Sequence, residues 1–486
     1  MGRDTAAPNI LLITLDQFRA DCLSCAGHPV VQTPALDDLA SQGLRLARHY
    51  SQAAPCSPGR AALYTGTYQM NNRVVANGTP LDTRFDNIAL AARRAGYAPA
   101  LFGYTDQGVD PRTVDDPDDP RLSTYEGVLP GFDPVLDMSG WQLPWLQWLN
   151  SQGYDFADPI SALEVENERP VSLSSSTFLT NGFVDWLADQ DQPWFAHLSY
   201  LRPHPPYSAA GDFGTMYDPS SCPPPLPVPE QHHQLFEALL HSPAAAPTDP
   251  LAVAEIQAQY FGMISEVDAQ LGRVWSLLHE RGEWDNTVIV VVADHAEQLG
   301  DQGLIQKAGF YESSYAVVGI VRNPGLGYVG VLDEFTENID IMPTLCDAMA
   351  IEVPAQCDGF PLTPFLRGER PTAWRDAAFY EWDWRDVFIP RGDHPWPWDR
   401  RLERQNLAVR RSRDHAFVHF GDGSWRCFDL AADPTWRTEV SDPATVLDEA
   451  AAMLSWRSRN LDRTMTGMLL QDGGIGRRPA ATPVSQ

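Results

Sequence analysis

A few short apolar segments, spread along the whole chain, constrain its fold more than any other feature. Residues 9–15 are almost entirely aliphatic, and residues 287–292 hold five Val or Ile in six positions; residues 98–102 and 194–200 are similar. Apolar runs without polar alternation are typical of strands buried on both faces. The alternation of these strands with helical patterns predicts an α/β fold with a mostly parallel central sheet flanked by helices. The helical patterns lie at residues 34–42, 87–95, 177–188 and 252–281.

The chain has 486 residues, more than one small core requires, so we expect one large domain and a smaller one. The main α/β domain is predicted over residues 1–370. From about residue 371 the composition shifts toward Trp and Arg. Residues 371–486 are predicted to form an α+β subdomain with a short antiparallel sheet, a helix and a polar tail. The strand-like pieces are residues 407–410 and 416–420, and the helical pattern covers residues 444–462.

The charge balance excludes several classes of partner. The net charge is −29, from 35 Lys and Arg against 64 Asp and Glu, which argues against binding to nucleic acid or to an acidic membrane surface. The seven cysteines are irregularly spaced and form no disulfide framework. Residues 1–8 are too polar for a signal peptide, and no apolar stretch is long enough to span a membrane. We therefore expect a cytoplasmic protein with neither a membrane nor a nucleic-acid partner.

Polar side chains follow the four predicted strands at the point where each strand ends. In an open α/β sheet the ligand site lies at the carboxyl ends of the strands, so these side chains are expected to meet at one edge. Two of them are carboxylates, two are imidazoles and one is a phenol. They are Asp16, Tyr104, His204, Asp294 and His295.

Three of these residues, Asp16, Asp294 and His295, predict a site for one divalent cation. Carboxylates are hard ligands, and the imidazole shifts the preference from Ca²⁺ toward transition metals. We favour Mn²⁺, with Ca²⁺, Fe²⁺ and Zn²⁺ as alternatives. The competing interpretation makes Asp16 a helix cap or turn former and His295 a buried histidine with satisfied hydrogen bonds.

The run Cys56-Ser57-Pro58-Gly59-Arg60 fits the pattern Cys-x-Pro-x-Arg, by which sulfatases and their relatives mark one cysteine for oxidation to formylglycine. The hydrated aldehyde has two hydroxyl groups: one attacks phosphorus or sulfur, and the other later expels the product. A thiolate could also attack, but it offers no such internal release. Ser57 and Pro58 suit the start of a helix, whose N-terminus helps to hold an anion. The alternative is a structural cysteine beside a helix cap.

From residue 9 to about residue 467 the chain resembles the sulfatase branch of the alkaline-phosphatase-like superfamily. The motifs that carry the resemblance occur in the family's order, at residues 9–16, 56–66, 96–97 and 294–301. The resemblance implies that modified Cys56 binds the metal together with Asp16, Asp294 and His295. It also implies maturation by a formylglycine-generating enzyme and a small anionic ester as substrate.

Within that branch the chain looks most similar to phosphonate monoester hydrolases, which also cleave phosphodiesters. Ordinary sulfatases carry a second acidic residue where this chain has Gln17, and a Gly-Lys-Trp-His run where it has residues 103–106. Residues 202–206, Lys307 and Asn77 also match the hydrolases. The resemblance implies cleavage of phosphonate monoesters and phosphodiesters, with sulfate esters as promiscuous substrates.

The resemblance assigns further roles by position. Arg60 would orient the nucleophile, and His204 would protonate the leaving oxygen with Lys307 as the alternative donor. Three positions depart from the family: Ala296 replaces a Gly, Gln302 replaces a frequent His, and an Asp replaces a Thr at position 106. The expected substrate contacts are Asn77, Tyr104, Thr105 and Asp106.

Two other functions stay open at this point. One is an aryl or alkyl sulfatase, because a singly charged sulfate ester resembles a phosphodiester at the metal. The other is a non-catalytic sulfatase-like binding protein, should Cys56 remain unmodified. Lys307 by itself would be a solvated surface lysine, and Asn77 with Gly78 would be a turn. We also expect a homo-oligomer.

Overall fold

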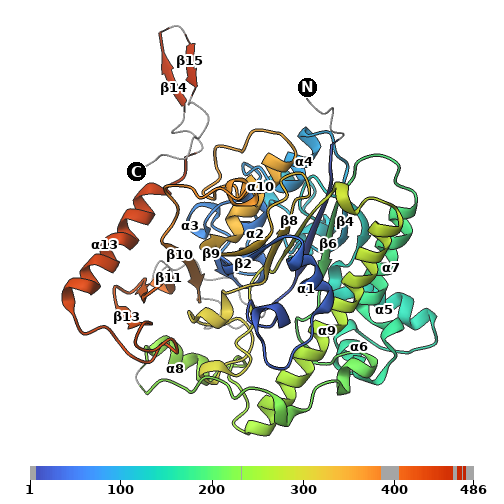
Figure 1. The fold of residues 1–486 in the computed structure, drawn as a ribbon, viewed down its shortest axis with the longest axis horizontal. Coiled ribbons are helices and arrows are strands. Elements are labelled where there is room, and N and C mark those ends of the chain that lie inside the picture. The colour runs from blue at the N-terminus through green and yellow to red at the C-terminus, as the bar shows by residue number, and fades with distance from the viewer. Residues whose placement is uncertain (1–6, 231, 385–403, 464–467, 473, 478–486) are drawn as a thin grey trace.

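The computed structural model of the protein describes residues 7–230, 232–384, 404–463, 468–472 and 474–477. Its centre is an eight-stranded sheet with the strand order β5-β4-β6-β1-β7-β8-β2-β9 (Figure 1). All neighbouring strands are parallel except β8, which is antiparallel to both β7 and β2. The predicted α/β fold is confirmed. The strands are β1 (Asn9–Leu15), β2 (Leu44–Tyr50), β4 (Pro99–Gly103), β5 (Asp133–Asp137), β6 (Phe195–Tyr200), β7 (Thr287–Val292), β8 (Gly319–Arg322) and β9 (Gly330–Glu337).

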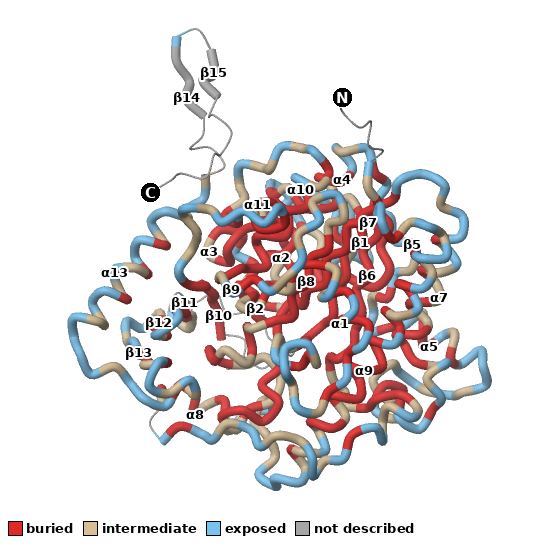
Figure 2. The backbone as a smooth tube through the Cα atoms, viewed as in Figure 1, coloured by how far each residue is buried: buried red, intermediate tan, exposed pale blue. Residues whose placement is uncertain are grey.

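Helices cover both faces of this sheet. Alternate residues of a strand point to opposite sides, so each strand contributes to two hydrophobic cores. Leu11, Ile13 and Leu15 of β1 belong to one hydrophobic core, whereas Ile10 and Leu12 belong to another. Every residue of β1 and β7 is buried (Figure 2). The first core includes α1 (Pro34–Ser41), α7 (Ser175–Ala188) and α9 (Pro250–Glu280), and the second includes α2 (Cys56–Thr65), α4 (Ile88–Arg94) and α10 (Ile341–Ala348).

A second sheet has the strand order β13-β12-β11-β10-β3. Four of its strands are antiparallel, and β3 (Ala53–Ala54) adds to β10 in parallel, with Ala54 opposite Trp382. The second sheet therefore touches the segment that leads directly into Cys56. Its C-terminal strands are β10 (Ala377–Asp383), β11 (Asn406–Ser412), β12 (His415–Phe420) and β13 (Trp425–Asp429).

Helix α13 (Pro443–Arg459) packs against this second sheet through Met453 and Trp456. The Trp456 ring stacks on Phe379 of β10 with 4.6 Å between the ring centroids. A hairpin of β14 (Met468–Gln471) and β15 (Gly474–Arg477) follows. The domain boundary at residue 370 remains a prediction, and the predicted polar tail, residues 478–486, lies outside the described residues.

Among the helices of the described residues, none combines the length and the apolar character that a membrane span requires. The longest, α9, keeps polar positions along its 31 residues.

Candidate active site

The carboxyl ends of β1 and β7, together with the start of α2, bring four potential ligands into one buried cluster. Asp16 follows β1, Asp294 and His295 follow β7, and Cys56 is the first residue of α2. Their ligand atoms all lie within 4.8 Å of one another. These are the four residues that the sequence and the resemblance together assigned to the metal.

The glycine of the Cys-x-Pro-x-Arg run allows α2 to approach this edge. A Cβ atom on Gly59 would lie only 2.4 Å from the backbone oxygen of Asp294, so a larger residue would push the helix away. Cys56 is thereby held against the cluster. Its Sγ lies 3.2 Å from His295 Nε2 and 3.3 Å from Lys307 Nζ.

The donor set fits a divalent cation. His295 Nδ1 donates to the Ala296 carbonyl oxygen at 3.2 Å, which leaves the lone pair of Nε2 directed at the cluster. Burial lowers the pKa of His295 to about 3, so the ring is neutral at pH 7. Asp16 Oδ1 is buried and has no hydrogen-bond partner within the described part of the chain. A buried carboxylate oxygen without a donor is costly unless a cation binds it.

Arg60 holds the two carboxylates of this cluster in place. Its fully buried guanidinium donates from Nε to Asp294 Oδ2 at 2.8 Å and from Nη2 to Asp16 Oδ2 at 3.1 Å. Nη1 donates to the Tyr104 carbonyl oxygen at 3.0 Å and to Ser199 Oγ at 2.8 Å. Arg60 therefore positions two of the predicted metal ligands, and its orientation of the nucleophile stays a prediction.

The acidic groups around Arg60 outnumber it. Burial raises the pKa of Asp294 to about 6, and the charge of Asp16 adds to this increase. Burial also raises the pKa of Asp106 to about 8, although Arg60 Nε lies 3.7 Å from Asp106 Oδ2. Both shifts come first from burial, with the charge of Asp16 adding to each, and a bound cation would lower both pKa values.

Lys307 connects the nucleophile position to His204. Its Nζ donates to His204 Nε2 at 2.8 Å and to Gln17 Oε1 at 3.1 Å. His204 Nδ1 in turn donates to the Pro205 carbonyl oxygen at 2.6 Å. Burial, and then the positive charge of Lys307, lowers the pKa of His204 to about 3. In this arrangement His204 Nε2 is an acceptor, whereas the sequence assigned it the role of proton donor.

All four predicted substrate contacts have protein partners in the structure, that of Asp106 being Arg60. Tyr104 donates from its hydroxyl to Asp16 Oδ2 at 2.6 Å, and its ring lies 4.3 Å from the Arg60 guanidinium carbon. The Thr105 hydroxyl donates to the Gly127 carbonyl oxygen at 2.7 Å. Asn77 Oδ1 accepts from the Ser57 backbone N–H at 2.9 Å, at the start of α2. Each therefore supports the site, and its contact with substrate stays a prediction.

Glu297 is a functional residue to which the sequence assigned no role. Its carboxylate is fully buried and accepts hydrogen bonds from Gln17 Nε2 and from the Tyr207 hydroxyl, the latter at 2.9 Å. It also accepts from the Gln306 backbone N–H, next to Lys307. Glu297 thereby orients both Gln17 and the segment that carries Lys307. Its position three residues after Asp294, inside a family motif, was the available signal.

The buried ion pair of Arg202 with Glu166 was also missed, and it shapes the loop that carries His204. Arg202 Nη1 donates to the carbonyl oxygens of His204 and Pro206, each at 2.8 Å. Arg202 Nε donates to Glu166 Oε2 at 3.0 Å. Glu166 lies 36 residues earlier in the chain, in a segment without any pattern, so the sequence offered no signal for it.

The fold and the site together define a class: a protein with a mostly parallel α/β sheet whose edge carries a candidate metal site of two carboxylates, an imidazole and a cysteine at a helix N-terminus. The sequence model described as Sulfatase matches residues 8–351, and one described as N-sulphoglucosamine sulphohydrolase, C-terminal, matches residues 300–455. The chain therefore belongs to the sulfatase family of hydrolases, within the alkaline-phosphatase-like superfamily.

Several solved structures and curated proteins are similar over nearly the whole chain. A phosphonate monoester hydrolase of Agrobacterium radiobacter is 40% identical with a TM-score of 0.89, covering 97% of this chain and 100% of that one. A phosphonate monoester hydrolase from Silicibacter pomeroyi is 36% identical with the same TM-score, covering 98% and 100%. The multifunctional alkaline phosphatase superfamily protein PehA of Trinickia caryophylli is 34% identical, covering 94% of this chain and 96% of its own length.

Proposed function

We propose that the protein hydrolyses phosphonate monoesters and phosphodiesters, using a formylglycine derived from Cys56 and one divalent cation, and that sulfate esters are side substrates. The observation that carries this proposal is the position of Cys56, in contact with both His295 of the ligand cluster and Lys307. The similarity to two phosphonate monoester hydrolases supports the choice of phosphorus over sulfur. Mn²⁺ remains the preferred cation within the proposal.

The state of the cysteine supports its conversion. Burial and the negative charge of Asp16 raise the pKa of the Cys56 thiol well above its usual value. A protonated thiol is a poor nucleophile, so unmodified Cys56 would react slowly here. Hydrated formylglycine at this position would supply one hydroxyl as the nucleophile and a second hydroxyl for product release. Maturation by a formylglycine-generating enzyme and a cytoplasmic location are parts of the same proposal.

The cation would be held by Asp16, Asp294 and His295 together with the side chain at position 56. When bound, it supplies positive charge where negative charge develops on the substrate. Arg60 holds the two carboxylates close together through its hydrogen bonds to both. Tyr104 fixes the second oxygen of Asp16, which leaves Oδ1 for the cation.

The geometry favours Lys307 as the group that stabilises the leaving oxygen. Burial alone would lower the pKa of Lys307, but Cys56, Asp16 and Asp294 outweigh burial and raise that pKa, so the side chain is charged at pH 7. His204 accepts a hydrogen bond from Lys307 and orients its ammonium group. This order of roles reverses the one expected from the sequence.

Lys307→Met should therefore slow substrates with poor leaving groups more strongly than His204→Ala does. A proton donor contributes about 10²- to 10⁴-fold, and a group that only orients the donor contributes less. The measurement is kcat/KM for each variant across a series of aryl esters of increasing leaving-group pKa. A steeper dependence in His204→Ala than in Lys307→Met would return the donor role to His204, and equal losses across the series would remove it from both.

The substrate class is tested by a panel on one preparation. The predicted cation and Lys307 supply positive charge at the site, Asp16 and Asp294 offset part of it, and Asp106, whose pKa burial raises to about 8, adds little charge at pH 7. A site with this balance should prefer a singly charged ester over a dianionic phosphate monoester, whose extra charge must also be neutralised. We expect the highest kcat/KM for matched aryl esters of a phosphonate and a phosphate diester, lower values for the sulfate, and the lowest for the phosphate monoester.

Two outcomes would replace this proposal. If the sulfate ester is preferred by orders of magnitude, the protein is an aryl or alkyl sulfatase, the function that the name of the family model favours. If none of the four esters is cleaved and mass spectrometry finds Cys56 as an unmodified thiol, the protein is a sulfatase-like binding protein.

A further inference from the structure

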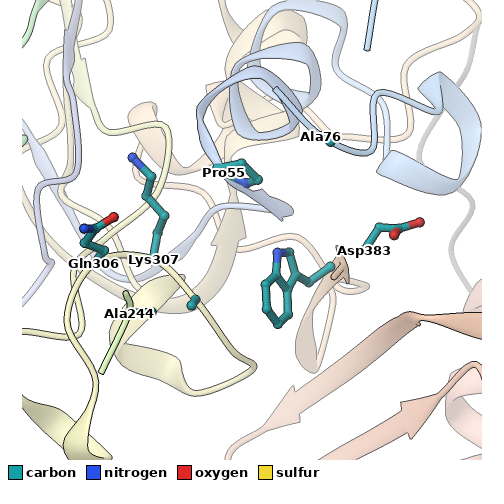
Figure 3. A pocket seen from close by; sticks show the side chains of 8 residues that line it. Pro55, Ala76, Ala244, Gln306, Lys307 and Asp383 are labelled. Atoms are coloured by element: carbon teal, nitrogen blue, oxygen red, sulfur yellow. The ribbon is translucent and has the colours of Figure 1, made fainter. Parts of the chain in front are cut away.

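A small cavity adjoins the active site on the side of Lys307. Its volume is about 140 Å³. Gln306, Lys307 and Ala244 lie on one side of it and Asp383 on the other, with Pro55 between them (Figure 3). Most of the lining is apolar and small. The apolar residues are Pro55, Ala76, Ala244, Ala308 and Trp382.

This cavity lies at the edge of the second sheet. Trp382 belongs to β10, and its backbone pairs with Ala54 of β3, the residue before Pro55. The register therefore fixes Trp382 close to the entry of α2, where Cys56 lies. Trp382 is only 4% exposed, so its position is set by the packing of the second sheet. The second sheet thereby contributes one wall next to the reacting centre.

We propose that this cavity is the subsite for the leaving group of the ester, and that it selects a single compact ring or a branched alkyl group of similar size. This inference rests on the proposed ester hydrolysis. A cavity of roughly 150 Å³ in another protein holds one benzene ring, so the volume suits a ring of six atoms. The three alanines keep the space open, and Trp382 and Pro55 offer flat apolar surfaces to a ring.

Lys307 indicates that the cavity lies on the leaving-group side of the reacting centre. It lines the cavity, and its Nζ lies 3.3 Å from Cys56 Sγ. The leaving oxygen has to lie within reach of the group that stabilises it. The organic group on that oxygen then extends into the cavity, whereas the substituent that stays on phosphorus points elsewhere. The cavity should therefore discriminate between leaving groups and not between retained groups.

Ala244→Leu tests this subsite, because it fills the cavity from a loop outside the catalytic machinery. Ala245→Leu is the matched control, since the next residue does not line the cavity. Each protein is assayed with phenyl and with trifluoroethyl esters of methylphosphonate. One misplaced aliphatic group in a pocket costs about 10- to 100-fold. We expect Ala244→Leu to lower the phenyl to trifluoroethyl ratio of kcat/KM by that factor, and Ala245→Leu to keep the parent ratio.

A second substrate pair separates the two sides of the ester. Phenyl esters of methylphosphonate and of phenylphosphonate share a leaving group and differ only in the retained group. Ala244→Leu should leave their ratio unchanged. A change in that ratio without a change in the first would assign the cavity to the retained group and overturn the proposal, as would equal losses on all esters or no loss at all. If the parent cleaves only sulfates, the proposed function fails, and phenyl and trifluoroethyl sulfates give the same test of the cavity.

Discussion

Cys56→Ala should abolish turnover while the protein keeps its fold. The expected loss in kcat/KM is at least about 10⁴-fold, because a hydrolase without its nucleophile retains only the rate that binding and electrostatics provide. Alanine is well tolerated in the first turn of a helix. The side chain of Cys56 is small, and its polar contacts are with His295 and Lys307 of the site. Removing it therefore changes the chemistry much more than the packing.

Cys427→Ala is the matched control for this variant. Cys427 is another buried cysteine, but it lies on β13 of the second sheet, outside the ligand cluster. The activity of Cys427→Ala should equal that of the parent protein. The melting temperatures of both variants should lie within a few degrees of the parent value. Mass spectrometry of the parent peptide that contains residue 56 should find formylglycine. Parent-like activity of Cys56→Ala would remove Cys56 from the mechanism.

The central strands could be predicted because burial on both faces makes them uniformly apolar. β1, β4, β6 and β7 are of this kind. The lateral strands were not predicted from the sequence, for physical reasons. β2 alternates apolar residues with Arg and His, β5 is an exposed edge strand, and β8 has only four residues. Such strands depend on partners supplied by the sheet, which a local pattern does not show.

The ligand cluster could be predicted because topology alone brings strand ends together. Asp16, Asp294 and His295 lie within three residues of a strand end, and parallel neighbours end at one edge. The partners of these residues could not be predicted in the same way. Glu166 pairs with Arg202 from a 3-10 helix, and Ser199 binds Arg60 from within β6. Both contacts depend on tertiary packing.

Roles were harder to predict than positions. The resemblance assigned Arg60 to the orientation of the nucleophile, and its hydrogen bonds in the structure include those to Asp16 and Asp294. His204 reaches the site as expected but accepts from Lys307. A residue type limits the chemistry that a side chain can perform. Which partner of a hydrogen bond carries the proton depends on the charged groups that lie nearby in the buried site.

The second large effect is expected for Asp294→Asn, which should lose both the bound metal and at least about 10³-fold in kcat/KM. Asp294 Oδ2 accepts from Arg60 Nε at 2.8 Å, and Oδ1 accepts from the backbone N–H groups of Gln17 and His295 at 3.2 and 3.0 Å. An amide has nearly the same shape, but its NH₂ group faces a donor in either orientation. The substitution also removes one of the negative charges expected to bind the cation. A bound catalytic metal ion stabilises the transition state by several kcal/mol, so this stabilisation should be lost with the metal.

Asp301→Asn separates this effect from a general loss of stability. Asp301 is also a buried carboxylate near the end of β7, and it accepts from Arg19 Nη1 at 2.9 Å and from the Leu226 N–H at 2.8 Å, but it lies outside the ligand cluster. Elemental analysis should find the parent and Asp301→Asn with equal metal content and Asp294→Asn depleted. Full metal occupancy in Asp294→Asn would exclude Asp294 as a ligand. Equal losses of activity and melting temperature in both variants would mean that buried charge, and not the metal, explains the effect.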